Sequence, residues 1–330
     1  MATLSLPDAE YIGVLPSKAK SDTIDTEHEN AILDIVASFI HGIDYSLPPF
    51  SWQDPALKAA TVKELQSWGI GEAMNGVMKY LDVGLGAAEL FYPSHHFELK
   101  IIVAISTTIV TWIDSVVDSI LDAVSDFQRR FYARLPQLHP VLDHFANYIL
   151  RLYDHYEAYV AGAMITSICC FMDVTCLEIR ALTKRMTAKR ESKLWPYYVR
   201  SLSGIASFYS FACFPKVDHP DLIHYIQAIP EMLIFTNHVN DVLSFYKEEM
   251  DGEQHNYCQM MSRVAELPPI NVLEDISRKA VSSAKCAEES LKDSPAALKA
   301  LMDYELGITQ VAFHHPCSTS SSRRIAATFT

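Results

Sequence analysis

Apolar residues recur along most of the chain at intervals of three and four, the spacing of one helical face at i, i+3, i+4 and i+7. Alternation of apolar and polar residues with a period of two is hardly sustained anywhere. Glycine is scarce, with 11 in 330 residues, and the 16 prolines are concentrated in segments typical of connections. The pattern predicts an all-α protein.

Between these connections the pattern predicts ten helical segments. We expect the long block 141–187 to be broken into two helices. The ten segments are about Glu27–Gly42, Pro55–Met78, Val83–Tyr92, His95–Val124, Val141–Thr187, Tyr197–Phe214, Asp221–Glu249, Asn256–Glu266, Val272–Leu291 and Ala296–His315.

The segments belong to one domain, because the interior contains no internal repeat and no Gly-, Ser- or Pro-rich linker of domain-joining length. We expect a helical domain over residues 25–316, a flexible N-terminal segment 1–24 and a flexible C-terminal tail 317–330. The longest uncharged apolar stretches, Ile101–Ile113 and Tyr159–Met172, are shorter than the about 20 residues of a membrane span. They predict helices buried inside a protein.

The chain is strongly acidic. Its 27 Lys and Arg against 40 Asp and Glu give a formal net charge of −13, and the pI is about 5.4. This excess argues against binding to nucleic acid or anionic membrane surfaces, which depends on Lys and Arg. An anionic ligand therefore requires a local exception.

The cysteines indicate a reducing compartment. They are seven, an odd number, and they lack CxxC spacing and mostly lie inside apolar runs. We interpret them as reduced core thiols of a cytoplasmic protein, not as a disulfide framework or a zinc site. The first residues carry acids early and show no basic segment followed by an apolar one, so we expect no secretory signal.

Four aspartates follow an uncharged apolar run at intervals of four residues. The segment IIVAISTTIVTWIDSVVDSILDAVSDF contains Asp114, Asp118, Asp122 and Asp126. On one continuous helix Asp114 and Asp118 share a face, where two carboxylates repel each other unless a cation or proton lies between them. Carboxylate oxygens suit Mg²⁺. The alternative is that the aspartates form the solvated face of an ordinary helix. Asp114, however, follows the apolar run with no polar turn before it, which favours a position at the rim of an apolar cavity.

A second set of oxygen donors lies in FTNHVNDVLSFYKEEM. Asn240, Ser244 and Glu248 are each four residues apart, so an amide oxygen, a hydroxyl and a carboxylate follow one helical face. They predict a second Mg²⁺ half-site that phosphate and water complete. Lys247 lies on an adjoining surface within reach of a phosphate. Asn and Ser inside a helix are usually surface or back-bonded residues, but the intact string N-D-V-x-S-x-x-x-E favours the metal interpretation.

These residues resemble the class I terpene synthases, whose metal motifs are DDxx(D/E) and (N/D)Dxx(S/T)xxxE. The sequence NDVLSFYKEE is similar in particular to that of the fungal trichodiene synthase-like sesquiterpene cyclases. The second motif matches fully. The first matches at Asp114 and Asp118 but has Ser115 where the family has a second Asp, which leaves the stoichiometry of that metal cluster open.

The resemblance extends to a third segment, WPYYVRSLSG. Arg200 lies 40 residues before Asn240, where the family has its diphosphate-sensing Arg, and a guanidinium can hold a diphosphate with two hydrogen bonds. Ser203 occupies the family's linker position and Gly204 its effector position, in a helix break. The resemblance also implies three Mg²⁺ ions, a single-domain helical bundle around a central apolar cavity, and a tendency to form homodimers.

The family's C-terminal Arg-Tyr pair is not visible in the stretch VAFHHPCSTSSSRRI. Candidates for its replacement are His314, His315, Arg323 and Arg324. The alternative is a disordered tail.

The resemblance implies a carbon–oxygen lyase that ionises farnesyl diphosphate and cyclises the farnesyl cation to a sesquiterpene. Mg²⁺, Arg200 and Lys247 would neutralise the departing diphosphate. The expected product is of the humulene type or trichodiene-like, because departures from the trichodiene pattern also occur in a divergent group of humulene-forming cyclases.

A carbocation requires an apolar, aromatic pocket, because π faces stabilise positive charge without reacting. Ordinary core packing is the alternative for each aromatic residue considered. The candidates for the pocket wall are Trp112, Phe208, Phe211 and Phe235, with Tyr209, Phe214, Phe313, Phe171 and Met172 in addition.

Other helical proteins also carry carboxylates. A di-iron protein needs Glu-x-x-His pairs, and the chain has none. A chain-elongating prenyl diphosphate synthase shares the fold but has an aspartate-rich second motif where this chain has Asn240 to Glu248. A non-catalytic diphosphate-binding homologue stays open because of Ser115 and the missing Arg-Tyr pair.

Overall fold

The computed structural model describes residues 26–46 and 54–314, and every regular element in these ranges is helical, which confirms the all-α prediction. The α-helices are α1 (Thr26–Gly42), α2 (Pro55–Ser67), α3 (Ala73–Met78), α4 (Leu81–Leu90), α5 (Phe97–Val116), α6 (Leu121–Ser125), α7 (Phe127–Ala133), α8 (Pro140–Tyr148), α9 (Leu152–His155), α10 (Ala158–Thr183), α11 (Trp195–Ser203), α12 (Ala206–Ala212), α13 (Ile229–Met250), α14 (Tyr257–Ala265), α15 (Pro269–Ser290) and α16 (Pro295–His314). Short 3₁₀ turns are η1 (Val117–Ser119), η2 (Ile149–Arg151), η3 (Leu222–His224) and η4 (Ile226–Ala228).

Prolines begin several of these helices. They occupy the first turn, where a missing N–H leaves no helical hydrogen bond unmade. The clearest cases are Pro55, Pro140, Pro196, Pro230 and Pro269. The prolines that indicated connections in the sequence therefore also set where the helices start.

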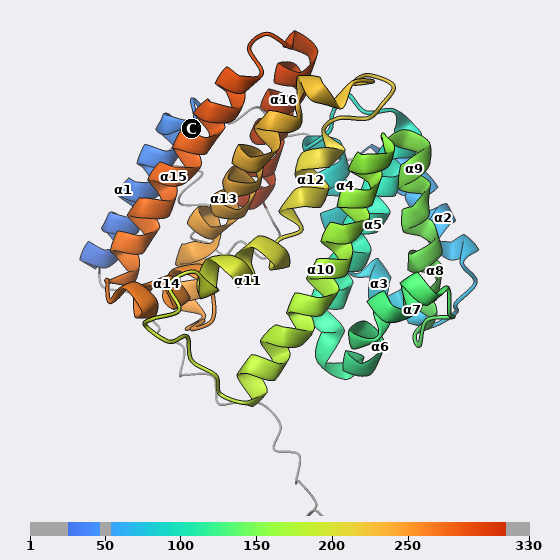
Figure 1. Ribbon diagram of the computed structural model, residues 1–330, viewed down its shortest axis with the longest axis horizontal. Coiled ribbons are helices and arrows are strands. Elements are labelled where there is room, and N and C mark those ends of the chain that lie inside the picture. The colour runs from blue at the N-terminus through green and yellow to red at the C-terminus, as the bar shows by residue number, and fades with distance from the viewer. Residues whose placement is uncertain (1–25, 47–53, 315–330) are drawn as a thin grey trace, which may run out of the picture.

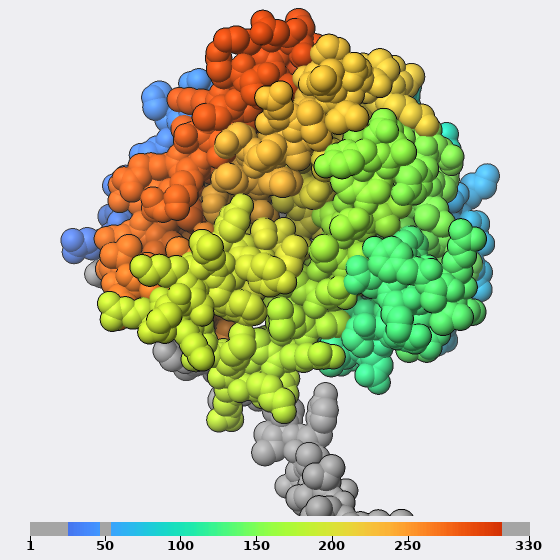
Figure 2. All heavy atoms as spheres, in the orientation of Figure 1, coloured from blue at the N-terminus to red at the C-terminus, as the bar shows by residue number. Residues whose placement is uncertain are grey.

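The helices form an inner group and an outer group. Figure 1 shows α5, α10 and α13 in the middle of the bundle, with α1 and α15 on one side and α2, α8 and α9 on the other. The most extensive packing joins α13 to α15 and α4 to α5, and α12 lies between α10 and α13. In the space-filling view, α11 fills part of the space between α13 and α10 on this face (Figure 2).

Two helical segments, Phe97–Ser119 and Ala158–Thr183, are long and apolar enough to cross a membrane by length and composition alone. They extend beyond the uncharged stretches noted in the sequence. Of their most apolar windows, 67% and 61% are buried inside the protein. Their apolar character is accounted for by packing against other helices, as expected of core helices.

Some predicted helices are interrupted. The segment predicted from Pro55 to Met78 divides into α2 and α3, because Gly69 and Gly71 adopt left-handed φ angles of 65° and 59°. The predicted break in block 141–187 is confirmed, since α10 begins only at Ala158. The segment predicted from Asp221 begins with the 3₁₀ turns η3 and η4, and α7 was not predicted as a separate helix. The proposed flexible segments 1–24 and 317–330 lie outside the described residues.

Candidate active site

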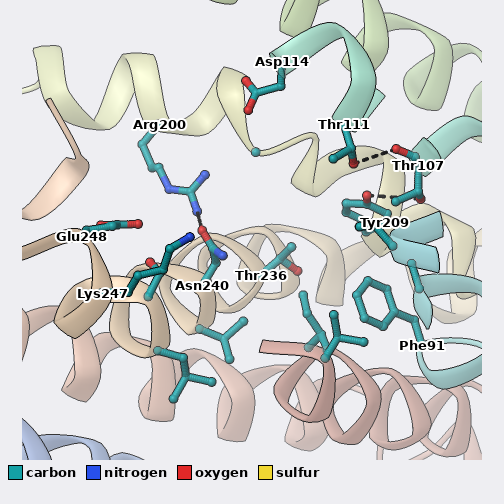
Figure 3. A pocket seen from close by; sticks show the side chains of 18 residues that line it. Phe91, Thr107, Thr111, Asp114, Arg200, Tyr209, Thr236, Asn240, Lys247 and Glu248 are labelled. Atoms are coloured by element: carbon teal, nitrogen blue, oxygen red, sulfur yellow. Dashed lines mark hydrogen bonds between the residues drawn. The ribbon is translucent and has the colours of Figure 1, made fainter. Parts of the chain in front are cut away.

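A cavity of about 490 Å³ lies inside the bundle, among α4, α5, α12, α13, α16 and the end of α11 (Figure 3). One part of its wall is ionic and another part is apolar. The charged and metal-motif residues are Asp114, Arg200, Asn240, Ser244, Lys247 and Glu248. The apolar residues are Val83, Ala87, Phe91, Val239, Leu243, Ile308 and Val311.

The polar face predicted for α13 faces this cavity. Asn240, Ser244 and Glu248 all line it, and they lie on a helix that is continuous from Ile229 to Met250. Lys247 lines the cavity beside them. The structure therefore brings these four side chains together in one part of the wall, as the spacing predicted.

Asp114 lines the cavity from α5, whereas Asp118 does not. The expectation that both lie on one helical face was wrong, because α5 ends at Val116 and Asp118 lies exposed in η1. The Ser119 hydroxyl donates to the Val116 carbonyl at 2.7 Å and so competes with the helical hydrogen bonds.

Arg200 connects α11 to α13. Its Nε donates to Asp241 Oδ1 at 2.7 Å, and its Nη2 donates to the Asn237 carbonyl at 2.9 Å. Nη2 also donates to Asn240 Oδ1 at 3.1 Å, as Figure 3 shows. The side chains of Arg200 and Asp241 are only 12% and 9% exposed. Asp241 is held from its other side by His238 Nδ1, 3.2 Å from Oδ2. This buried ion pair fixes the direction of the guanidinium at the cavity wall.

A side chain in the turn after α11 would displace Arg200 or Asn237. The break expected at Gly204 is present, since α11 ends at Ser203. A Cβ on Gly204 would lie 2.5 Å from both Arg200 Nη1 and Asn237 Oδ1. The next residue, Ile205, has a φ of 40°, a left-handed conformation that strains a β-branched residue. Gly204 lines the cavity, whereas Ser203 does not.

Carboxyl groups crowd one end of the cavity and shift one another's ionisation. Burial raises the pKa of Glu248 to about 7, Glu253 and Asp241 add to the rise, and Arg200 opposes it. Burial also raises the pKa of Asp114, although this side chain retains exposed surface.

These acids continue into a second cavity of about 240 Å³, which shares Asp114 with the first. Its wall includes Glu178 and Glu253. Burial and the neighbouring Asp114 raise the pKa of Glu178 to about 7. A divalent cation would relieve this accumulation of negative charge.

The oxygen donors fit Mg²⁺. The Ser244 hydroxyl is buried and has no well-formed hydrogen bond to a described residue, although it lies near enough to Glu248 to lower that carboxyl's pKa. Burying a hydroxyl without a hydrogen-bond partner costs free energy, and a ligand that bonds to the hydroxyl offsets this cost. Within residues 26–46 and 54–314, no three His, Cys, Asp or Glu residues are arranged to hold a metal ion. An ion at this site therefore needs the amide, the hydroxyl and ligand oxygens in addition to carboxylates.

The aromatic wall differs from the one expected. Phe208 and Phe235 are 0% exposed, Trp112 and Phe211 nearly so, and none of the four lines the cavity. The ring of Trp112 instead contacts His139, with 5.2 Å between the ring centroids. Helices inside a bundle carry apolar residues on more than one face, so their periodicity does not separate core from cavity.

The aromatic residues in the cavity wall are Phe91, which was not predicted, and Tyr209, one of the additional candidates. Hydroxyl groups of Thr107, Thr111 and Thr236 also line it and were missed. A signal for them exists in the spacing. Thr107 and Thr111 precede Asp114 by seven and three residues, and Thr236 precedes Asn240 by four, so each continues a metal-motif face.

The candidates for the missing Arg-Tyr pair cannot be placed. His315, Arg323 and Arg324 lie outside the described residues, as do the side chains of His314 and Phe313.

The comparisons with known proteins agree with one another. The trichodiene synthase (TRI5) family model matches residues 92–315. Terpene synthase BipA of Cochliobolus sativus is 31% identical over 249 residues, 76% of each chain. Alpha-cuprenene synthase COP6 of Coprinopsis cinerea is 32% identical over 227 residues, 69% of this chain and 67% of that protein. The crystal structure of linalool/nerolidol synthase from Streptomyces clavuligerus matches with a TM-score of 0.59 at 11% identity, over 81% of this chain and 99% of the other.

Proposed function

The chain belongs to the trichodiene synthase family and is a class I terpene synthase, and we propose that it is a Mg²⁺-dependent sesquiterpene cyclase. Its proposed substrate is farnesyl diphosphate. It ionises the substrate, cyclises the farnesyl cation and releases diphosphate. The product class that we propose is a humulene-type or trichodiene-like sesquiterpene.

One observation carries this proposal: two sets of oxygen donors and a positioned arginine meet at one end of a cavity whose remaining wall carries no charged side chain. Asp114 comes from α5, Asn240, Ser244 and Glu248 come from α13, and Arg200 comes from α11. An ionic end for a diphosphate beside an apolar chamber for a hydrocarbon is the arrangement that allylic ionisation needs.

The residues have separate proposed roles. Asp114, Asn240, Ser244 and Glu248 would hold Mg²⁺, which when bound supplies positive charge to the diphosphate leaving group. Arg200 and Lys247 donate hydrogen bonds to the diphosphate. The turn at Gly204 keeps Arg200 in place. Asp118 does not line the cavity and would join the ligands only after a rearrangement of η1.

The apolar chamber protects the cation. The side chains of Phe91 and Tyr209 present π faces, and the aliphatic residues around them exclude water from most of the wall. A cytoplasmic location, a homodimeric state and a count of three Mg²⁺ ions are further parts of the proposal that rest on the sequence alone.

The purified protein is incubated with Mg²⁺ and C10, C15 or C20 prenyl diphosphates, and released diphosphate and extracted volatiles are measured. We expect a sesquiterpene from the C15 substrate, which EDTA abolishes. Asn240→Ala and Glu248→Ala should remove product, whereas Glu249→Ala should retain it, because the Glu249 carboxylate contacts His28 at 3.0 Å and does not line the cavity. Neither product nor diphosphate release with any substrate would refute the enzyme function.

A further inference from the structure

The cavity contains a group of hydroxyls that the ionisation step does not use. Thr107 and Thr111 of α5 and Tyr209 of α12 line the wall together. Figure 3 shows them grouped on the side of the pocket away from Arg200, Lys247 and Glu248. We call these three side chains the hydroxyl cluster.

The hydrogen bonds within the hydroxyl cluster leave some donor and acceptor positions of the three hydroxyls unused. Tyr209 Oη donates to Thr107 Oγ1 at 3.2 Å, and Thr111 Oγ1 donates to the Thr107 carbonyl at 2.9 Å. Each hydroxyl has one proton and two lone pairs. Among the described residues, the Thr107 hydroxyl proton has no acceptor, and lone pairs on Tyr209 and Thr111 have no donor. Burial raises the pKa of Tyr209 to about 12, so its phenol stays protonated and remains a donor.

A hydrocarbon chain cannot satisfy these groups. With the diphosphate held at the ionic end, the remainder of a prenyl substrate lies against the apolar wall and the hydroxyl cluster. Each of the three hydroxyls already takes part in one hydrogen bond, but its remaining donor or acceptor positions lie at the cavity wall. A water molecule bound in a protein needs two to four polar partners. One free donor and two acceptors, close together, meet that requirement.

We propose that the hydroxyl cluster holds a water molecule that captures the final carbocation, so that a main product is a terpene alcohol. This inference rests on the proposed function, because the cation must first be formed there. The ester C–O bond breaks with its electron pair on the diphosphate. A lone pair of the held water then forms a new C–O bond to the cation, and the proton lost by the resulting oxonium ends on the released diphosphate. The sum is substrate plus water giving alcohol plus hydrogen diphosphate.

Labelled water tests the source of the oxygen in the unmodified enzyme. The reaction is run with farnesyl diphosphate and Mg²⁺ in H₂¹⁸O, and products are analysed by gas chromatography with mass spectrometry. We expect a terpene alcohol heavier by two mass units than the one formed in ordinary water. Diphosphate release accompanied only by unlabelled hydrocarbons would overturn the inference and leave the proposed function intact. Absence of diphosphate release would contradict the proposed function itself.

Variants test whether the hydroxyl cluster holds that water. Thr107→Val and Tyr209→Phe each remove one hydroxyl with little change of shape. In both, the ratio of alcohol to hydrocarbon should fall about tenfold, the factor expected for one lost hydrogen bond, and this ratio is read within the product mixture, so it does not depend on the overall rate. If both variants kept the wild-type ratio, the water site would be refuted.

Thr108→Val is the matched control. Thr108 is a fully buried threonine on the same helix, and its hydroxyl donates to the Ala104 carbonyl at 2.7 Å. It does not line the cavity. Its product ratio should equal that of the unmodified enzyme, whereas a shift equal to that of Thr107→Val would indicate a general packing effect and overturn the assignment.

Discussion

Gly204 lies directly against the side chains of Arg200 and Asn237. In Gly204→Ala, the new Cβ meets Arg200 Nη1 and Asn237 Oδ1 at 2.5 Å, so the guanidinium must move. Misplacement of a binding group by about 1 Å costs roughly 100-fold in rate. We expect kcat/KM to fall by at least about tenfold, with a free energy of unfolding within about 1 kcal/mol of the unmodified protein.

Steady-state kinetics and urea unfolding measure these two quantities. Ser201→Ala is the control, because Ser201 lies exposed on the same helix and its hydroxyl donates to the Tyr198 carbonyl, its one hydrogen bond among the described residues. Its activity should stay within about twofold. Full activity in Gly204→Ala would show that the position of Arg200 does not limit the reaction.

Glu248 makes metal binding dependent on pH. Its pKa is about 7 in the folded protein, against an ordinary value of 4.5, because burial disfavours the charged form. A protonated carboxyl must lose its proton before it binds a metal ion. The apparent Mg²⁺ affinity should therefore fall by up to about tenfold per pH unit below pH 7, as measured by the Mg²⁺ dependence of activity at pH 6, 7 and 8.

The same pKa has the opposite effect on the stability of the metal-free protein. Between pH 4.5 and about 7 the folded state binds more protons at Glu248 and Glu178 than the unfolded state does. Their contribution to stability is therefore present below pH 4.5 and is lost as pH rises through 7.

The variant Glu248→Gln tests the prediction on metal binding. Its Mg²⁺ affinity should be low at every pH, and an unchanged pH dependence of that affinity would assign the titration to another group.

At the scale of elements, two helices that contribute to the cavity wall, α16 and α4, approach each other very closely at a point outside that wall. A Cβ on Gly307 would lie 1.9 Å from the Leu90 carbonyl oxygen, and backbone atoms cannot move aside as a side chain does. Gly307→Ala should therefore lower the free energy of unfolding by about 3 kcal/mol, because the two helices must separate. Since Ile308 and Val311 of α16 line the cavity, the product distribution should also change.

Urea unfolding and product analysis check both effects. Gly162→Ala is the matched control in the middle of a helix, where a Cβ makes only an ordinary contact of 3.5 Å with Tyr153 Oη. It should raise stability by about 0.5–1 kcal/mol, the helix propensity difference between Ala and Gly. A Gly307→Ala variant as stable as the unmodified protein would mean that α16 is not anchored on α4.

The elements show what periodicity can and cannot predict. It predicted α13 and the shared face of Asn240, Ser244 and Glu248, because a regular helix has a fixed spacing. It failed at the end of α5, where the apolar pattern continues but a 3₁₀ turn, in which the Ser119 hydroxyl bonds to the Val116 carbonyl, replaces the α-helix. It also did not separate Phe235 in the core from Phe91 in the cavity, because both are apolar positions whose surroundings depend on tertiary packing.

At the scale of the whole molecule, the charge of −13 opposes the approach of a diphosphate. Among the described residues, two cationic side chains, Arg200 and Lys247, line the cavity beside two carboxyls, Asp114 and Glu248, and Arg200 is already paired with the buried Asp241. Inorganic diphosphate should therefore bind at least about tenfold more tightly in the presence of Mg²⁺ than in EDTA.

Isothermal titration calorimetry measures the difference. Arg200→Ala should weaken binding in Mg²⁺, whereas Arg278→Ala should not, because Arg278 is exposed on α15 and pairs with Glu274 at 3.3 Å. Tight binding of diphosphate in EDTA would contradict the proposed role of the metal motifs.

In the free protein, Arg200 and a metal ion compete for one atom. Asn240 Oδ1 accepts a hydrogen bond from Arg200 Nη2 at 3.1 Å, and the same oxygen is the one that a metal would use. An anion that attracts the guanidinium frees the oxygen, and a cation that takes the oxygen frees an N–H group for the anion. By thermodynamic reciprocity, each ligand strengthens the binding of the other by the same factor. With Asn240 and Arg200 in their proposed roles, a cation alone or an anion alone must first break the hydrogen bond between them, so the two ligands together should bind more tightly than either one does separately.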